Sequence, residues 1–135
     1  ASFSVQLSRN HPLLRETPFD FAKLKNYPYV AYTDGNGGNL NWTPWSSVVN
    51  SDKLIRVQSI ASRISLVAST NAFSLVFPHS RAYNEANGVV TVPLPFDPLI
   101  LGYIYSRDRG LGETGEAYVR HLKERIREHF GEESP

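Results

Sequence analysis

The segment best suited to chemistry is a glycine-rich loop, residues 33–39, which follows a short apolar run. Its hydroxyl, amide and backbone N–H groups can hold a carboxylate or another polar small molecule. The candidate ligand-binding residues in this loop are Thr33, Asp34, Gly35 and Asn36. A flexible turn has the same composition, so that alternative stays open. The negative charge of Asp34 also disfavours an anion directly beside it, which argues against a simple anionic ligand.

Ser59 is a second candidate, because it immediately precedes a stretch with helical periodicity. A serine in this position caps a helix by accepting a backbone hydrogen bond, which is worth roughly 1 kcal/mol. The positive end of the helix dipole would also favour a bound ligand. We expect capping to be the main role of Ser59 and ligand binding to be its minor role.

Sequence motifs of enzyme and metal chemistry are missing. The chain has no cysteine, and its four histidines fall on separate predicted elements without the spacing of metal ligands. It contains no nucleophile elbow and no dinucleotide fingerprint, and the glycines of the loop lack the lysine of a phosphate loop. We therefore expect no catalysis, no metal and no cofactor. An enzyme would have to use residues that no motif reveals.

Patterns of apolar residues define the elements that position these candidates. Period-two alternation and short β-rich runs predict strands at 3–8, 29–32, 54–57, 73–77, 89–92 and 99–105. Helical signals predict helices beginning at Thr17–Pro18 and near Thr43, and longer ones at 59–70 and 113–130. This alternation indicates an α/β domain with an open, mostly parallel sheet and helices on both faces, including the two longer ones. Ligands bind beyond the carboxyl ends of strands in such sheets, and the loop and Ser59 both follow strands.

The same patterns predict which side chains are buried. Residues 3–8 alternate as a half-buried strand does, and Phe21 and Leu24 are the expected buried contacts of the first short helix. Along 59–70, spacing places one face of the helix in the core, formed by Ile60, Ile64 and Val67. Along 113–130, an apolar stripe is formed by Val119, Leu122, Ile126 and Phe130.

Length and composition are those of one ordinary globular domain. The chain has 135 residues, of which 41% are hydrophobic and 20% charged, so it can bury a core. Its net charge of +1 provides no basic field for nucleic acid. No apolar run reaches membrane-spanning length, and the absence of cysteine fits a reducing cytoplasm. Because the chain opens inside a predicted strand and contains no methionine, we interpret it as a piece of a longer protein.

Three segments, in this order, resemble the effector-binding domain of LysR-type transcriptional regulators. They are residues 5–13 with His-Pro-Leu after a strand, residues 24–30 with a proline before a strand, and residues 59–78 with helix, strand and proline. The similarity extends over nearly the whole chain. Thr70 and Phe73 stand where the family usually has glycines. We expect Asn71 to take the left-handed conformation at the end of that helix instead.

The resemblance implies a periplasmic-binding-protein type II fold. Residues 1–98 would be the second effector subdomain, 99–130 a returning strand and C-terminal helix of the first subdomain, and 131–135 a tail. In the family the loop after residue 32 faces the cleft between subdomains, and Thr33 matches a position that commonly touches effector. Gly102, in the returning strand, is the last candidate effector-binding residue. With its first subdomain incomplete, the apolar stripe of the C-terminal helix would favour self-association.

The implied function is sensing of a small-molecule effector by a cytoplasmic, homo-oligomeric regulator that is not an enzyme. DNA contacts would be made only by an N-terminal domain absent from this chain, and no membrane would be involved. Two alternatives share the architecture: a fragment of a solute-binding protein of a transport system, and a dehydratase-like enzyme. A helix-turn-helix in the preceding sequence would indicate the regulator, and a secretion signal would indicate the transporter.

Overall fold

The computed structural model describes residues 3–33, 51–77, 79–95 and 102–130. The chain divides into two compact units, residues 2–96 and residues 97–135 with residue 1. The elements of the first unit are, in chain order, β1 (Ser4–Ser8), the 3-10 helices η1 (Pro12–Arg15) and η2 (Phe21–Asn26), β2 (Tyr29–Tyr32), β3 (Leu54–Val57), α1 (Ile60–Ser69), β4 (Phe73–Val76), α2 (Arg81–Ala86) and β5 (Val89–Pro93). The described part of the second unit contains α3 (Gly112–Phe130).

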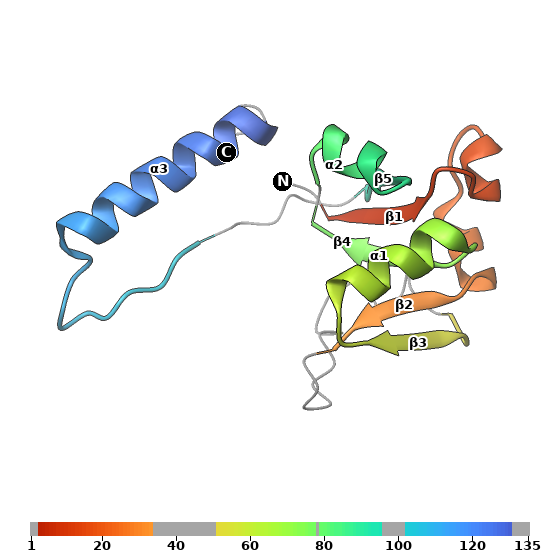
Figure 1. Cartoon of the computed structure of the whole chain (residues 1–135), viewed down its shortest axis with the longest axis horizontal. Helices are drawn as coiled ribbons and strands as arrows, with labels where there is room; N and C mark the ends of the chain where they lie inside the picture. Colours follow the sequence, from red (N-terminus) through yellow and green to blue (C-terminus); the bar gives the residue numbers. More distant parts are fainter. Residues whose placement is uncertain (1–2, 34–50, 78, 96–101, 131–135) are drawn as a thin grey trace. The chain divides into compact units, whose positions relative to one another are not determined.

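The first unit is built on a five-stranded open sheet with the order β3-β2-β4-β1-β5 (Figure 1). Strand β2 pairs in parallel with β3 and β4, whereas β1 is antiparallel to both β4 and β5. Four strands therefore run in one direction and β1 alone of the five runs in the other. This confirms the predicted mostly parallel α/β sheet. The carboxyl ends of β2, β3, β4 and β5 lie at one edge, together with the start of β1.

Both faces of the sheet are covered, each by a different kind of helix. Strand alternation places Val5 and Leu7 on the face that packs against η1 and η2. The buried side chains of this layer are Val5, Leu7, Leu13, Leu24, Phe73 and Leu94. On the opposite face, Val67 of α1 packs with Val30 and Val89 of the sheet. Helices on both faces were predicted and are confirmed, and helix 59–70 is one of them. The expectation that helix 113–130 also flanks the sheet stays a prediction, because it belongs to the second unit.

Strand β1 is buried on both sides, because α1 and the 3-10 helices sandwich it. The prediction of a half-buried strand was therefore wrong: its polar residues do not face water. The Ser8 hydroxyl donates a hydrogen bond to the Ala68 carbonyl of α1, at 3.0 Å. Gln6 is completely buried, and neither amide atom has a hydrogen-bond partner in the described chain. Its same-face neighbours across the ladder are Ser74 and Thr91. A polar seam thus runs between the sheet and its helices.

The first short helix begins later than predicted. Residues 21–26 form a 3-10 helix whose first backbone N–H groups are met by Asp20, where the Asp20 carboxylate accepts a hydrogen bond from the Ala22 amide at 3.0 Å. The predicted start at Thr17–Pro18 was wrong, because the aspartate nearer to the apolar contacts serves as the cap. Leu24 is fully buried as expected, while Phe21 is only partly buried against the same core.

Helix α1 ends through the side chain of Thr70. Its hydroxyl donates to the Leu66 carbonyl at 2.6 Å and accepts from the Ala72 amide at 3.1 Å. Asn71 does not adopt the predicted left-handed conformation, because a threonine closing the helix in this way makes it unnecessary. Ile64 and Val67 are buried as predicted, but Ile60 is 54% exposed because it lies in the first turn, at the open margin of a groove toward α2.

The second unit differs from prediction in one element. Residues 102–105, the described part of the predicted strand 99–105, are not a strand, and Ile104 is fully exposed. An extended segment needs a neighbouring strand for its backbone groups, and none pairs with this part. Helix α3 is present as predicted, and Leu122, within its apolar stripe, is 40% exposed. The predicted helix near Thr43 lies outside the described residues.

His11 joins the 3-10 layer to the end of α1. It is buried, its Nδ1 accepts a hydrogen bond from the Leu13 amide at 3.2 Å, and its Nε2 faces the Asn71 carbonyl at 3.1 Å. These contacts suit the neutral ring with the proton on Nε2, because a second proton on Nδ1 would oppose the Leu13 N–H. Burial lowers the pKa of His11, and the bond to Asn71 only partly offsets this.

We predict that His11 makes stability depend on pH. The unfolded chain takes up the proton near pH 6.5, but the folded chain resists it, so the free energy of unfolding is complete above about pH 6.5 and falls below it. His11→Asn should flatten this fall, by at most about 1.4 kcal/mol per pH unit. Urea unfolding from about pH 7 to pH 5 measures it. His121→Asn, on the exposed surface of α3, is the control, and equal curves for His11→Asn and the parent would contradict the prediction.

Candidate functional site

The carboxyl ends of β2 and β3 bring two of the predicted site residues to one edge. The Thr33 amide donates to the Val57 carbonyl at 2.9 Å, which extends the pairing of the two strands by one residue. The Thr33 side chain is nearly buried, and its hydroxyl makes no hydrogen bond within the described chain. Ser59 follows two residues after Val57 and is exposed. Its hydroxyl accepts from the Ser62 amide at 3.4 Å, so its predicted role as the cap of α1 is confirmed.

The structure does not place the other predicted site residues relative to these two. Asp34, Gly35 and Asn36 lie outside the described residues. Gly102 belongs to the second unit, is exposed, and has no described atom within 4 Å of the position that a Cβ would occupy. The assignment of all six residues to an effector site stays a prediction.

Three residues that sequence reasoning did not select gather at the same edge. Arg63 lies one turn into α1, and its side chain leans toward the start of that helix, as helical side chains do. His79 follows the carboxyl end of β4, and Tyr83 lies in the first turn of α2. The His79 and Tyr83 rings are in contact, with centroids 4.7 Å apart. We call Arg63, His79 and Tyr83 the basic cluster.

The basic cluster contains nitrogen atoms without partners. Arg63 Nε and His79 Nε2 are both buried, and neither has a hydrogen-bond partner in the described chain. Burial lowers the pKa of Arg63, which the hydroxyls of Tyr83 and Tyr29 partly counter. Burial also lowers the pKa of His79, and the charge of Arg63 lowers it further. Among the described residues, no carboxylate opposes the positive charge of Arg63.

Sequence periodicity could not identify this cluster, because its members come from three elements separated by up to twenty residues. Position 63 belongs to the polar side of the helical pattern, and a solvated arginine is the usual occupant there. The one signal in the sequence was the position of each residue just after a strand end, which is where α/β sheets bind ligands. That signal selected Ser59 but did not distinguish Arg63 from other arginines.

A shallow groove of about 640 Å³ runs between α1 and α2. Its lining includes apolar residues of both helices, among them Ile60, Ile64 and Tyr83. Neither Thr33 nor Ser59 lines it, so the groove is separate from the strand ends where the predicted site residues lie. Within the described ranges, no group of three or more His, Asp or Glu side chains could hold a metal ion.

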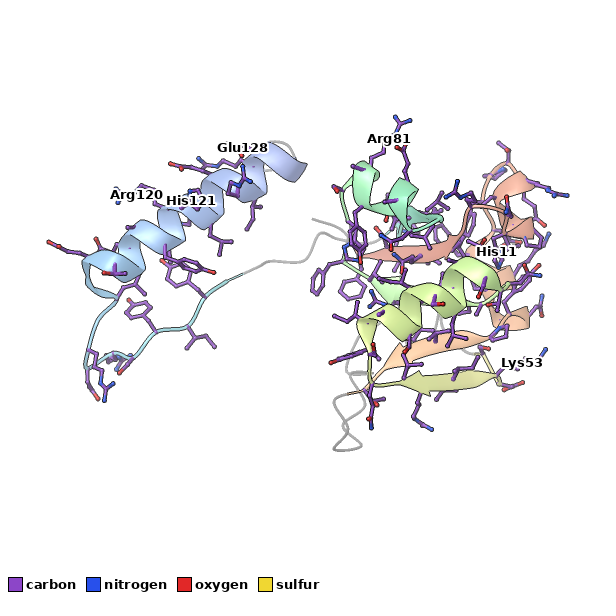
Figure 2. The ribbon with its side chains drawn as sticks, in the orientation of Figure 1. His11, Lys53, Arg81, Arg120, His121 and Glu128 are labelled. Carbon is purple, nitrogen blue, oxygen red and sulfur yellow. The ribbon has the colours of Figure 1, made fainter. Side chains whose placement is uncertain are left out.

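Two exposed ion pairs lie along the described helices, and neither includes a residue of the basic cluster. Arg81 pairs with Glu85 at 2.7 Å and Arg125 with Glu128 at 2.9 Å, both exposed along helices (Figure 2). Such exposed pairs contribute about 0–1 kcal/mol each and create no binding site. No described helix is both long enough and apolar enough to cross a membrane.

Comparisons with known proteins agree with this architecture. Residues 2–127 match the family model described as the LysR substrate binding domain. Among solved structures, a protein from Vibrio parahaemolyticus is similar with a TM-score of 0.64 and 19% identity, over 96% of this chain and 63% of that one. One from Pseudomonas aeruginosa is similar with a TM-score of 0.56 and 21% identity, over 71% of this chain and 33% of that one. Both are provisionally described as transcriptional regulators.

At these identities the structural matches show the fold alone. The chain spans about a third of one of these proteins and less than two thirds of the other. A comparison with curated protein sequences found no similar sequence. The match to the family model, which extends over nearly the whole chain, decides the classification, and with it the periplasmic-binding-protein type II-like fold. The chain belongs to the LysR substrate binding domain family.

Proposed function

We propose that this domain senses a small-molecule effector for a LysR-type transcriptional regulator. The family match over residues 2–127 carries the proposal. The unpaired polar groups at the carboxyl edge of the sheet support it, because ligands of open α/β sheets bind there. The effector would act by binding one arrangement of the regulator better than another, which shifts DNA contacts made by another part of the protein.

Several finer assignments belong to this proposal. Residues 1–98 would form the second effector subdomain, 99–130 would belong to the first, and 131–135 would be a tail. The effector site would include Thr33, Ser59 and the residues not described or not placed here, Asp34, Gly35, Asn36 and Gly102. The regulator would work in the cytoplasm without catalysis. A solute-binding protein of a transport system is the second candidate, because it shares the fold.

Thr33→Val tests the proposed site. The change removes a hydroxyl that has no described partner and keeps the shape and the amide bond to Val57. We expect the effector dose-response of the full-length regulator to shift to concentrations about 3- to 10-fold higher, as for one lost hydrogen bond. A reporter gene behind the regulator's own promoter provides the readout, with compounds that change its output.

Thr70→Val is the matched control for this experiment. It makes the same chemical change, but the Thr70 hydroxyl closes α1, far from any proposed ligand contact. Thr70→Val should lower the melting midpoint and leave the dose-response in place, while Thr33→Val does the reverse. An unchanged dose-response with Thr33→Val would reject the assignment of Thr33.

Self-association is the second testable part of the proposal. The apolar stripe on α3 includes Leu122, which is 40% exposed, and a continuous stripe of this kind favours burial against another surface. Burying such a side chain fully contributes about 1.5–3 kcal/mol. We expect light scattering after size exclusion to show an oligomer of this chain, and Leu122→Lys to reduce its size. A strictly monomeric chain at high concentration would contradict this.

A further inference from the structure

We propose that the effector is an anion and that Arg63 is the residue that pairs with its negative charge. This rests on the proposed sensing function and adds to it the chemical class of the ligand and a residue that selects it. The argument comes from the basic cluster, whose members belong to α1, to the connection after β4 and to α2.

The first step is the cost of the arrangement as it stands. The Nε of Arg63 is enclosed, and no hydrogen bond or ion pair to this side chain exists in the described chain. A guanidinium that has lost water on one side and gained no acceptor destabilises the folded protein. The exposed Arg81 of α2 has a carboxylate partner, Glu85, although water can also solvate an exposed guanidinium. A bound ligand that supplies the missing acceptor would explain why a partly buried arginine without a partner is present here.

The second step is the choice of partner. Arginine presents a planar fork of N–H donors that fits a carboxylate, phosphate or sulfate. Among the described residues, the groups that interact electrostatically with Arg63 are the hydroxyls of Tyr83 and Tyr29 and the imidazole of His79. His79 adds a second unpartnered ring nitrogen and Tyr83 a hydroxyl. All of these groups can donate to an anion. A neutral or cationic ligand would leave the Arg63 charge uncompensated.

The third step concerns Asp34, whose charge argued from sequence against an anion beside the glycine-rich loop. The proposed contacts come from α1, the connection after β4 and α2, and residues 34–39 are no part of them. The sequence argument about Asp34 therefore concerns a different segment of the chain.

The experiment measures the melting midpoint of the chain with matched charged and neutral probes. The probes are sodium sulfate, disodium succinate and its neutral analogue succinamide, with sodium chloride added to keep ionic strength constant. We expect sulfate or succinate to raise the midpoint and succinamide to leave it unchanged. In Arg63→Gln the affinity for the anion should fall by about tenfold to a hundredfold, the effect of one charge-assisted bond.

Arg56→Gln is the matched control, because Arg56 is an exposed arginine on the neighbouring strand β3. It should keep the full response to anions. Without any probe, Arg63→Gln should melt at or above the parent, because an unpaired charge has been removed, and circular dichroism verifies its fold. Arg63→Lys, which keeps the charge but not the fork, should retain part of the response.

Three results would overturn the inference: succinamide as effective as succinate, a full anion response in Arg63→Gln, or no response of the parent to either anion. These outcomes are separable from failure of the sensing function. If the reporter responds only to a neutral compound, the sensing function stands and the proposal of an anionic effector is rejected. If the chain binds anions but no compound changes transcription, anion binding at Arg63 stands and the sensing function is rejected.

Discussion

Replacing Phe73 with alanine should lower the free energy of unfolding by about 3–5 kcal/mol, as for other large buried aromatic residues. Phe73 is fully buried in the layer between the sheet and the 3-10 helices. It lies opposite Leu7 in the β1–β4 ladder, and its ring contacts that of Tyr29 at 5.4 Å between centroids. Truncation would leave a cavity bordered by three strands that pair through hydrogen bonds and cannot collapse to fill it.

Phe77→Ala is the matched control in the same stretch of chain. Phe77 is 49% exposed and contacts Phe3 with 4.7 Å between ring centroids. Its truncation should cost about 1.5 kcal/mol or less, the worth of an aromatic pair at the surface. Urea denaturation of the parent and both variants gives the comparison. Equal losses for the two phenylalanines would show that the layer around Phe73 is not the main core.

The second large effect has the opposite sign. Gln6→Met should raise the free energy of unfolding by about 1–3 kcal/mol, the cost of an unpaired buried amide. Methionine has a similar volume and shape, so it keeps the packing between β1 and α1. The buried amide of Gln6 has no described partner on either atom, and its ladder neighbour Ser74 already donates to the Val30 carbonyl at 2.8 Å.

Gln58→Met serves as the comparison, because residue 58 is exposed at the end of β3 and the change should leave stability within about 0.5 kcal/mol. Guanidinium unfolding of the two variants at one pH measures the difference. A loss of stability in Gln6→Met would mean that the Gln6 amide is hydrogen-bonded in solution, through water held in the polar seam.

The sheet could be predicted well because its strands are short apolar runs bounded by proline, glycine or polar residues. The runs at Tyr29–Tyr32 and Leu54–Val57 have the observed bounds, and Ser59 caps α1 as its type and position indicate. The direction of β1 could not be read from periodicity, because a period of two is the same in either direction. Only the complete ladder shows that β1 lies antiparallel between two later strands.

Two of the failures of prediction share a cause, which is competition between neighbouring polar groups. Asp20 and Thr17 can both cap a short helix, and Asp20, which lies nearer in sequence to the buried Leu24, is the residue that does so. Thr70 and Asn71 could each end α1, and the hydroxyl, which can bond both ways along the chain, is the group that does so. For residues 102–105, apolar content alone indicated a strand, but a strand also needs a partner, which local sequence does not contain.

The rule that ligands bind at the carboxyl ends of parallel strands led from the sequence to Thr33 and Ser59. The structure places both residues at one edge of the sheet, and their role in binding stays a prediction. The basic cluster depends on burial, and burial of an arginine or a histidine is not encoded in its own neighbours. His11 illustrates the same limit, since its position after a strand does not indicate that it is buried between two elements far apart in the chain.

The position of β1 has a consequence for how the protein is made. Of the five strands of this sheet, β1 is synthesised first, yet Ser4 pairs with Val76 and Pro93, which belong to the last two strands of the sheet to be made. Until then the apolar side chains of the first strand have no sheet to enter, and closing such long loops is slow. On the ribosome, β1 would stay unpaired while β2, β3 and α1 are synthesised. The nascent chain is thus most exposed to aggregation, and most dependent on chaperones, before residue 93 has left the exit tunnel.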